Sequence, residues 1–201
     1  MIDYEYVTGI LARFEGKAIQ RGYIPCQKGT WYPDGQEKGE ILGQSGVTIA
    51  TGVDLGQQTE KGFAGLSATV LDKLRPYFGL KKQEAKAALI HKPLVLSTEE
   101  VKQIDLLIHK RYIDETAAMF GRTIFEAAPK QVQAVAVSLH YQFGTPKRKE
   151  SPALEKTWEA MRYGLYREAA ELLENADLWS QGHRAYFARR RAEAALLKEA
   201  V

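Results

Sequence analysis

The sequence has a single cysteine, Cys26, among its 201 residues, and the lack of a second thiol excludes a disulfide within the chain. Catalysis by Cys26 would need an activating histidine, so we interpret it as an ordinary loop residue. The fold must then be held by packing alone. Hydrophobic residues make up 45% of the chain, which is enough to bury the core of one domain.

Long apolar runs are missing as well. No stretch of about 18 apolar residues is present, so the sequence predicts no membrane-spanning helix. The first residues, Met1 to Tyr6, lack the basic patch and the apolar segment of a secretory signal. We therefore expect a protein made in the cytoplasm, and a role outside the membrane would need another export route.

Patterns typical of metal and nucleotide sites are also absent. The four histidines are scattered, and neither a His-Glu-x-x-His pattern nor a Gly-x-Gly-x-x-Gly element is present. We expect no metal and no cofactor. The net charge of +3 suits a polyanionic partner without identifying one. We interpret the run Arg189-Arg190-Arg191 as a solvated helix face and not as a nucleic-acid site.

The spacing of apolar residues predicts different secondary structure in different parts of the chain. Residues 3–13 predict a helix that Asp3 could cap. Residues 21–58 hold eight of the 17 glycines, and the segment Tyr32-Pro33-Asp34-Gly35 predicts a turn. Within this stretch, residues 46–56 carry large apolar side chains on odd positions, which predicts a half-buried strand or hairpin.

After Phe63 the sequence predicts helices. Ser97 and Glu100 form a capping box at the start of a long helix, and residues 129–141 are so apolar that we expect them to form the central core helix. The other expected helices are 67–77, 82–90, 152–162, 166–174 and about 182–198. The fold class is therefore α+β and mostly helical. We expect one domain over 1–201, with a small β lobe at about 15–62, a helical lobe of 63–201 plus 1–14, and a cleft between the lobes.

Glu15 is the first candidate for chemistry. It follows Phe14 at the end of the first expected helix, where the partial negative charge of the helix terminus and an apolar neighbour both favour a protonated carboxyl group. Protonation of a glycosidic oxygen requires a carboxyl group of this kind. From its position alone, a surface glutamate at a helix end is the simpler interpretation.

Thr48 and Asp54 form the second candidate group. They have the same parity in the alternating segment, and a hydroxyl beside a carboxylate could hold and deprotonate a water. Six residues of straight strand would place them about 20 Å apart, so the chain must bend between them. The most natural place is Thr51-Gly52, because glycine can take a positive φ. Without the bend, Thr48 is an ordinary strand threonine and Asp54 a turn residue.

Three segments contain or adjoin these candidates, and they are Phe14-Glu15-Gly16, Gly22-Tyr23-Ile24-Pro25 and Ser45-Gly46-Val47-Thr48-Ile49-Ala50-Thr51-Gly52-Val53-Asp54-Leu55-Gly56. They resemble the active-site region of a known family, the pesticin-type bacterial toxins related to T-even phage lysozyme. Weaker similarities are Leu139-His140-Tyr141-Gln142-Phe143-Gly144, Tyr166-Arg167-Glu168-Ala169-Ala170, Trp179 and Arg184-Ala185. The resemblance extends over nearly the whole chain.

The resemblance implies a lysozyme-like fold and a muramidase that cleaves the β-1,4 bond between N-acetylmuramic acid and N-acetylglucosamine. Attack by water would invert the anomeric centre without a cofactor or metal. Glu15 matches the general acid, and Thr48 and Asp54 match the pair that places the water. Gln142 matches a substrate-binding residue of the cleft, and Arg184 matches an arginine that pairs with the catalytic glutamate.

Two departures from the family pattern leave alternatives open. In the phage enzymes the aspartate precedes the threonine, so Asp34 is a rival of Asp54, which we favour. The stretch from Cys26 to Gln44 is longer than expected. Its aromatic residues, Trp31 and Tyr32, could line a sugar groove, or the stretch could be a hairpin that covers the β lobe.

The biological setting is also open at this stage, because an endolysin, a secretion-system effector and a bacteriocin domain would share this chemistry. We expect a monomer that acts on peptidoglycan in the periplasm after non-classical release. An immunity protein or export machinery would be its protein partner, and we expect no nucleic acid. The alternatives are a catalytically inactive lysozyme-like protein that binds or supports the cell wall, and a related glycosidase of chitin-type polymers.

Overall fold

The computed structural model describes residues 1–146, 152–179 and 187–201. They form two compact units, one of residues 15–108 and the other of residues 1–14 and 109–201. The prediction of a mostly helical α+β fold with a small N-terminal sheet is confirmed. The unit that contains the sheet extends to Ile108, beyond the expected lobe boundary near residue 62. The assignment of the whole chain to one domain stays a prediction.

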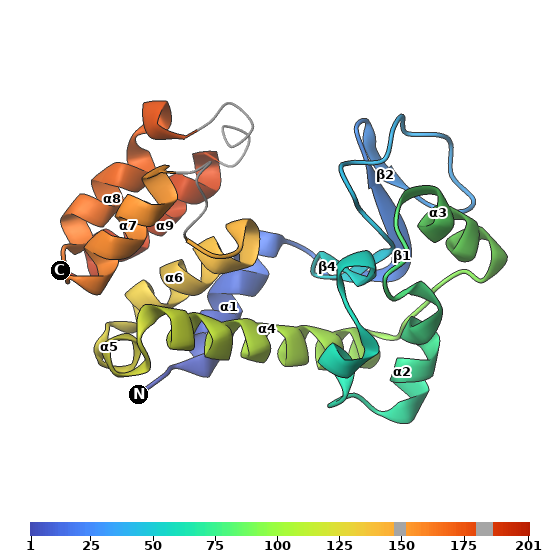
Figure 1. Cartoon of the computed structure of the whole chain (residues 1–201), viewed down its shortest axis with the longest axis horizontal. Helices are drawn as coiled ribbons and strands as arrows, with labels where there is room; N and C mark the ends of the chain where they lie inside the picture. Colours follow the sequence, from blue (N-terminus) through green and yellow to red (C-terminus); the bar gives the residue numbers. More distant parts are fainter. Residues whose placement is uncertain (147–151, 180–186) are drawn as a thin grey trace. The chain divides into compact units, whose positions relative to one another are not determined.

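The sheet of the 15–108 unit has four antiparallel strands in the order β2-β1-β3-β4 (Figure 1). The strands are β1 (Ile19–Cys26), β2 (Gly29–Trp31), β3 (Thr48–Ala50) and β4 (Val53–Asp54). The last two form a tight hairpin in which Thr48 pairs with Asp54. Both ends of its turn have positive φ, 57° at Ala50 and 83° at Gly52. The predicted bend at Thr51-Gly52 is thereby confirmed, because only a reversal of the chain can set Thr48 opposite Asp54.

Short helices follow the sheet along the chain in the same unit, and of these α3 packs on β1 and η1 on β3. They are η1 (Leu55–Gln57), η2 (Glu60–Phe63), α2 (Ala68–Leu74), η3 (Arg75–Tyr77) and α3 (Lys82–His91), followed by the first half of α4 (Thr98–Phe120). The region around α3 packs tightly on β1 at Gly22, where an added Cβ would lie 2.9 Å from Leu94 Cβ and 3.0 Å from Leu89 Cδ1. The predicted capping box is present, since Ser97 N donates to Glu100 Oε2 at 2.8 Å and Glu100 N donates to Ser97 Oγ at 3.2 Å.

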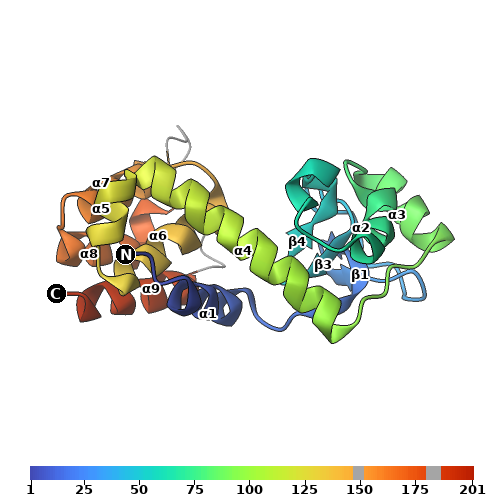
Figure 2. The same cartoon turned by 90° about the horizontal axis from the view of Figure 1, so that it is seen from below.

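The other unit is a bundle of helices around a single core (Figure 2). It contains α1 (Tyr4–Glu15) up to Phe14, the second half of α4, α5 (Arg122–Ala127), α6 (Lys130–Phe143), α7 (Pro152–Arg162), α8 (Tyr166–Glu174), η4 (Ala176–Leu178) and α9 (Phe187–Glu199). Every residue of α6 from Val132 to His140 is buried, which confirms it as the central helix. Asp3 caps α1 as predicted, because its carboxylate accepts a hydrogen bond from Tyr6 N at 3.0 Å.

The arginine run on α9 corrects one prediction. Arg190 is buried and Arg189 is mostly buried, so the prediction of a solvated face is wrong for these two residues and holds only for Arg191, which is exposed. Helical spacing brings both guanidinium groups to the fully buried Glu193, at 2.8 Å for Arg190 Nη2 and 3.3 Å for Arg189 Nε. Ser138 of α6 also donates to this carboxylate. Burial raises the pKa of Glu193, and the two guanidinium groups and the Ser138 hydroxyl oppose that rise.

Candidate functional site

Glu15 is the last residue of α1 and is half-buried. Its carboxylate lies beside the turn of the β3–β4 hairpin, because a Cβ added to Gly52 would stand 3.7 Å from Glu15 Oε2. Gly52 therefore meets two needs at once. It takes the positive φ of the turn, and it leaves the space next to the carboxylate open.

Thr48 and Asp54 lie opposite each other on neighbouring strands, and Tyr23 of β1 lies opposite Thr48 on its other side. Directly opposed residues of antiparallel strands project to the same face of a sheet. The three residues therefore make a row across β1, β3 and β4. Thr48 is buried, and its hydroxyl donates to Gly46 O at 3.4 Å. Its oxygen keeps lone-pair capacity to accept a hydrogen bond from a water.

The carboxylate of Asp54 is held in a fixed orientation by two backbone amides. Asp54 Oδ1 accepts from Gly46 N at 3.0 Å and from Gly56 N at 2.9 Å. The two glycines are in close contact, since a Cβ on Gly46 would lie 2.6 Å from Gly56 Cα and 2.4 Å from Leu80 O. Burial raises the pKa of Asp54, while these amide bonds and nearby Lys81 act in the opposite direction.

A carboxylate that sequence reasoning missed anchors the hairpin turn. Asp105 Oδ1 on α4 accepts from Thr51 N at 3.1 Å and from Thr51 Oγ1 at 2.6 Å. This contact joins residues 54 positions apart in the sequence, and Thr51 is buried. Asp105 thus fixes the turn that brings Thr48 and Asp54 together. Its only sequence signal is its place beside the buried Ile104 on an amphipathic helix.

A comparison of the sequence with protein-family models identifies the family. The sequence matches over residues 2–163 the family model described as "Pesticin: Bacterial toxin homologue of phage lysozyme, C-term". The chain belongs to this family. The matched residues include Glu15, Thr48, Asp54 and Gln142, and they end before α8 and α9. A search of curated proteins found no match. The family predicted from the sequence is confirmed, and with it the lysozyme-like class of the fold.

Within this pesticin-family chain, the structure places Asp34 differently from its rival Asp54. The side chain of Asp34 is 68% exposed and pairs with Arg21, whose Nη2 lies 2.8 Å from Asp34 Oδ1. The hydrogen bond from Arg21 lowers the pKa of Asp34. Asp34 follows the end of β2 and is not paired with Thr48, whereas Asp54 is. These contacts favour Asp54 as the partner of the threonine.

The aromatic residues of the 26–44 stretch point to opposite faces of the sheet. Trp31 is buried, pairs with Ile24 and lies under Lys86 of α3, whose Nζ is 4.7 Å from the Trp31 ring centroid. It is therefore a core residue, and the groove-lining alternative is wrong for it. Tyr32 lies on the other face, with its ring centroid 6.2 Å from that of Tyr23.

Of the two site residues expected from the helical half, Gln142 lies on α6 and contacts α9. Gln142 Oε1 accepts from Arg190 Nη2 at 2.6 Å, so the buried arginine of α9 fixes the amide. Its role in substrate binding stays a prediction. Arg184 lies outside the described residues.

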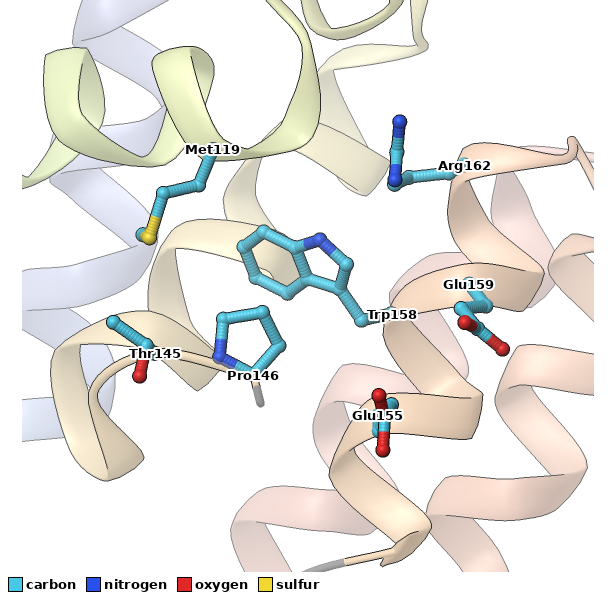
Figure 3. A pocket seen from close by; sticks show the side chains of 7 residues that line it. All are labelled: Met119, Thr145, Pro146, Glu155, Trp158, Glu159 and Arg162. Carbon is cyan, nitrogen blue, oxygen red and sulfur yellow. The ribbon is translucent and has the colours of Figure 1, made fainter. Parts of the chain in front are cut away.

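The helical unit also has a pocket of its own, with a volume of about 420 Å³ (Figure 3). The indole of Trp158 points toward Met119 and Pro146, and two carboxylates of α7 lie at the side. The lining residues are Met119, Thr145, Pro146, Glu155, Trp158, Glu159 and Arg162. None of the predicted site residues is among them, so we do not assign the family's chemistry to this pocket.

Neither a metal site nor a membrane span is found in the part of the chain that the structure describes. No three His, Cys, Asp or Glu side chains there are grouped so as to hold a metal ion. None of the described helices combines the length and the apolar character needed to cross a bilayer.

Proposed function

We propose that this chain is a peptidoglycan muramidase that hydrolyses the β-1,4 bond between N-acetylmuramic acid and N-acetylglucosamine. One observation carries the proposal: Glu15 lies beside the turn of a hairpin whose two strands set Thr48 opposite Asp54. A carboxylic acid on one side and a carboxylate with a water-binding hydroxyl on the other are the groups that an inverting glycosidase uses. Membership of a lysozyme-homologous toxin family supports this choice of substrate.

Each group has a separate role in the proposed reaction. Glu15 donates its proton to the glycosidic oxygen as the bond to the leaving sugar breaks. A water donates one hydrogen bond to Thr48 Oγ1 and one to the carboxylate of Asp54, which leaves a lone pair to attack the anomeric carbon. Asp54 takes the proton from this water. Because burial raises the pKa of Asp54, its carboxylate is a stronger base than an exposed aspartate.

The family description as a toxin favours a killing role in the periplasm over a purely structural one. The net charge of +3 would assist approach to the anionic cell wall, and salt would weaken that effect. An immunity protein in the producing cell would be the expected partner of such an enzyme. Gln142 and Arg184 would contribute to substrate binding and to pairing with Glu15, respectively.

The test is the clearing of a suspension of Gram-negative cells with permeabilised outer membranes. Glu15→Gln preserves the size of the side chain and removes the acid, so the rate should fall about 100-fold or more. Asp54→Asn should cause a loss of similar size, whereas Asp34→Asn, which changes an exposed carboxylate that is not paired with Thr48, should lower the rate far less. Undiminished clearing by Glu15→Gln would refute the mechanism.

Two other outcomes would point to other functions. A wild-type protein that binds cell walls without clearing them would be a binding or structural member of the lysozyme class. A wild-type protein that releases sugars from chitin-type polymers but not from peptidoglycan would be a related glycosidase. Both outcomes contradict the muramidase proposal.

A further inference from the structure

Tyr23 stands beside the candidate catalytic groups. It lies on β1 directly opposite Thr48, which in turn lies opposite Asp54. Neighbouring strands are about 4.8 Å apart, so Tyr23 projects from the same face at one strand's distance from Thr48. The residues on either side of it, Gly22 and Ile24, are buried, while Tyr23 is half-buried.

The phenol group of Tyr23 lies within electrostatic reach of both carboxylates. Burial raises the pKa of Tyr23, and the charges of Asp54 and Glu15 add to the rise. The hydroxyl therefore keeps its proton throughout the neutral range. It is a neutral hydrogen-bond donor next to two groups that act as acid and base.

The ring of Tyr23 is held in place by Tyr32 and Arg21. Tyr32 packs against it at a 52° tilt, and Arg21 lies over the Tyr32 ring at 5.3 Å from its centroid. Arg21 is bonded in turn to Asp34. Among the residues that the structure describes, the Tyr23 hydroxyl makes no hydrogen bond. Its ring is restrained while its donor stays available.

The other polar groups of the row cannot supply this donor. The Thr48 hydroxyl donates its proton to Gly46 O, and an ionised Asp54 only accepts. Glu15, when protonated, has one proton, which the reaction consumes. An N-acetylated sugar presents hydroxyl and acetamide oxygens that need donors when they leave water.

We propose that Tyr23 contacts the substrate, its hydroxyl donating a hydrogen bond to an oxygen of the sugar that Glu15 and Asp54 act on. The inference rests on the proposed function and adds a specificity-determining residue to it. Tyr32 and the Arg21–Asp34 pair position the Tyr23 ring. This gives the long 26–44 stretch a role at the site, through Tyr32 and Asp34.

The test variant is Tyr23→Phe, which keeps the ring and removes the hydroxyl. We expect kcat/KM for release of reducing ends from soluble glycan strands to fall about 10-fold, the value of one hydrogen bond. The melting temperature should stay at the wild-type value, because the hydroxyl bonds no described protein group. The matched control is Tyr163→Phe, which alters a tyrosine that is 79% exposed in the other unit.

A binding measurement separates this inference from the hydrolysis mechanism. In the Glu15→Gln background, adding Tyr23→Phe should weaken calorimetric binding of a soluble tetrasaccharide of alternating N-acetylglucosamine and N-acetylmuramic acid about 10-fold. If the wild type releases no reducing ends, the proposed function fails. The difference in tetrasaccharide affinity between Glu15→Gln and the double variant then tests the contact between Tyr23 and the sugar by itself.

Three results would overturn the inference. They are wild-type kinetics in Tyr23→Phe, unchanged tetrasaccharide affinity in the double variant, and a loss of activity matched by a fall in melting temperature. The last would show that the hydroxyl supports the fold and not the substrate. A fall in kcat/KM and in affinity at constant melting temperature supports the contact.

Discussion

The anchoring of the hairpin turn by Asp105 gives a prediction that needs no substrate. Asp105→Ala removes the acceptor of two hydrogen bonds, from Thr51 N at 3.1 Å and Thr51 Oγ1 at 2.6 Å. Hydrogen bonds to a charged group contribute about 1.5–3 kcal/mol each, which sets an upper bound of about 3–6 kcal/mol. Asp105 is half-exposed and water can replace part of the loss, so we expect about 2–3 kcal/mol for opening of the turn.

The assay is native-state hydrogen exchange of the Thr51 amide, read by NMR. A loss of about 2–3 kcal/mol corresponds to exchange that is about 30- to 150-fold faster. Asp105→Asn keeps an oxygen in place and loses the charge, so its effect should be smaller. The turn also positions Gly52 beside Glu15, and misplacement there should reduce cell clearing by Asp105→Ala about 10- to 100-fold.

The matched control lies on the same helix. Glu99 is 73% exposed and is 3.6 Å from Lys102, and surface pairs of this kind contribute little. Glu99→Ala should leave both Thr51 exchange and clearing unchanged. If Asp105→Ala behaves in the same way as Glu99→Ala in both assays, the anchoring argument is wrong.

Three further predictions follow from the site and the core. Because burial raises the pKa of Asp54, its ionised form costs stability above pH 3.8. Asp54→Asn should therefore raise the melting temperature, more at pH 7 than at pH 4, while clearing falls about 100-fold or more because the base is lost. Gly46→Ala would force a Cβ to within 2.4 Å of Leu80 O, so urea denaturation should show a loss of about 1–3 kcal/mol, and a variant as stable as wild type would contradict the close packing. Burial lowers the pKa of His140 below its usual 6.5, so as the pH drops below about 6.5 the imidazole is protonated in the unfolded chain before it is protonated in the folded one. The free energy of unfolding should therefore fall as the pH drops below about 6.5, and it should fall less in His140→Gln.

Local signals in the sequence were sufficient for much of this structure. Asp3, Ser97 and Glu100 act within one helical turn, so their capping roles could be predicted. The β3–β4 hairpin followed from alternation and from Gly52, because a chain that had to bend between Thr48 and Asp54 had one position suited to it. These features depend on neighbours in the sequence.

Features that depend on distant partners could not be predicted. The Thr51–Asp105 anchor spans 54 positions, and no local pattern distinguishes Asp105 from other acidic residues of α4. The arginine run was misinterpreted for the same reason, because runs of charged residues usually face water and the sequence does not show the distant partners that bury Arg189 and Arg190. Arg190 is buried because Glu193 and the distant Gln142 accept hydrogen bonds from its guanidinium group. Packing between elements decided these cases.

The alternation of faces on β1 and β2 decided the question that the 26–44 stretch had left open. Trp31 pairs with Ile24 on the core side, and Tyr32 lies next to Tyr23 on the side of Thr48. A shift of one residue in register would move Trp31 to the side of Thr48 and Tyr32 to the core side. The register could not be read from the sequence, which is why both alternatives were open.

The central claim is that Glu15 and Asp54 hydrolyse the glycan strand of peptidoglycan with a water. Mass spectrometry of the soluble products from purified peptidoglycan tests it most directly. We predict muropeptides that end in a reducing N-acetylmuramic acid from the wild type, and none above background from Glu15→Gln. Products that end in 1,6-anhydro-N-acetylmuramic acid, or equal release by the two proteins, would contradict the account.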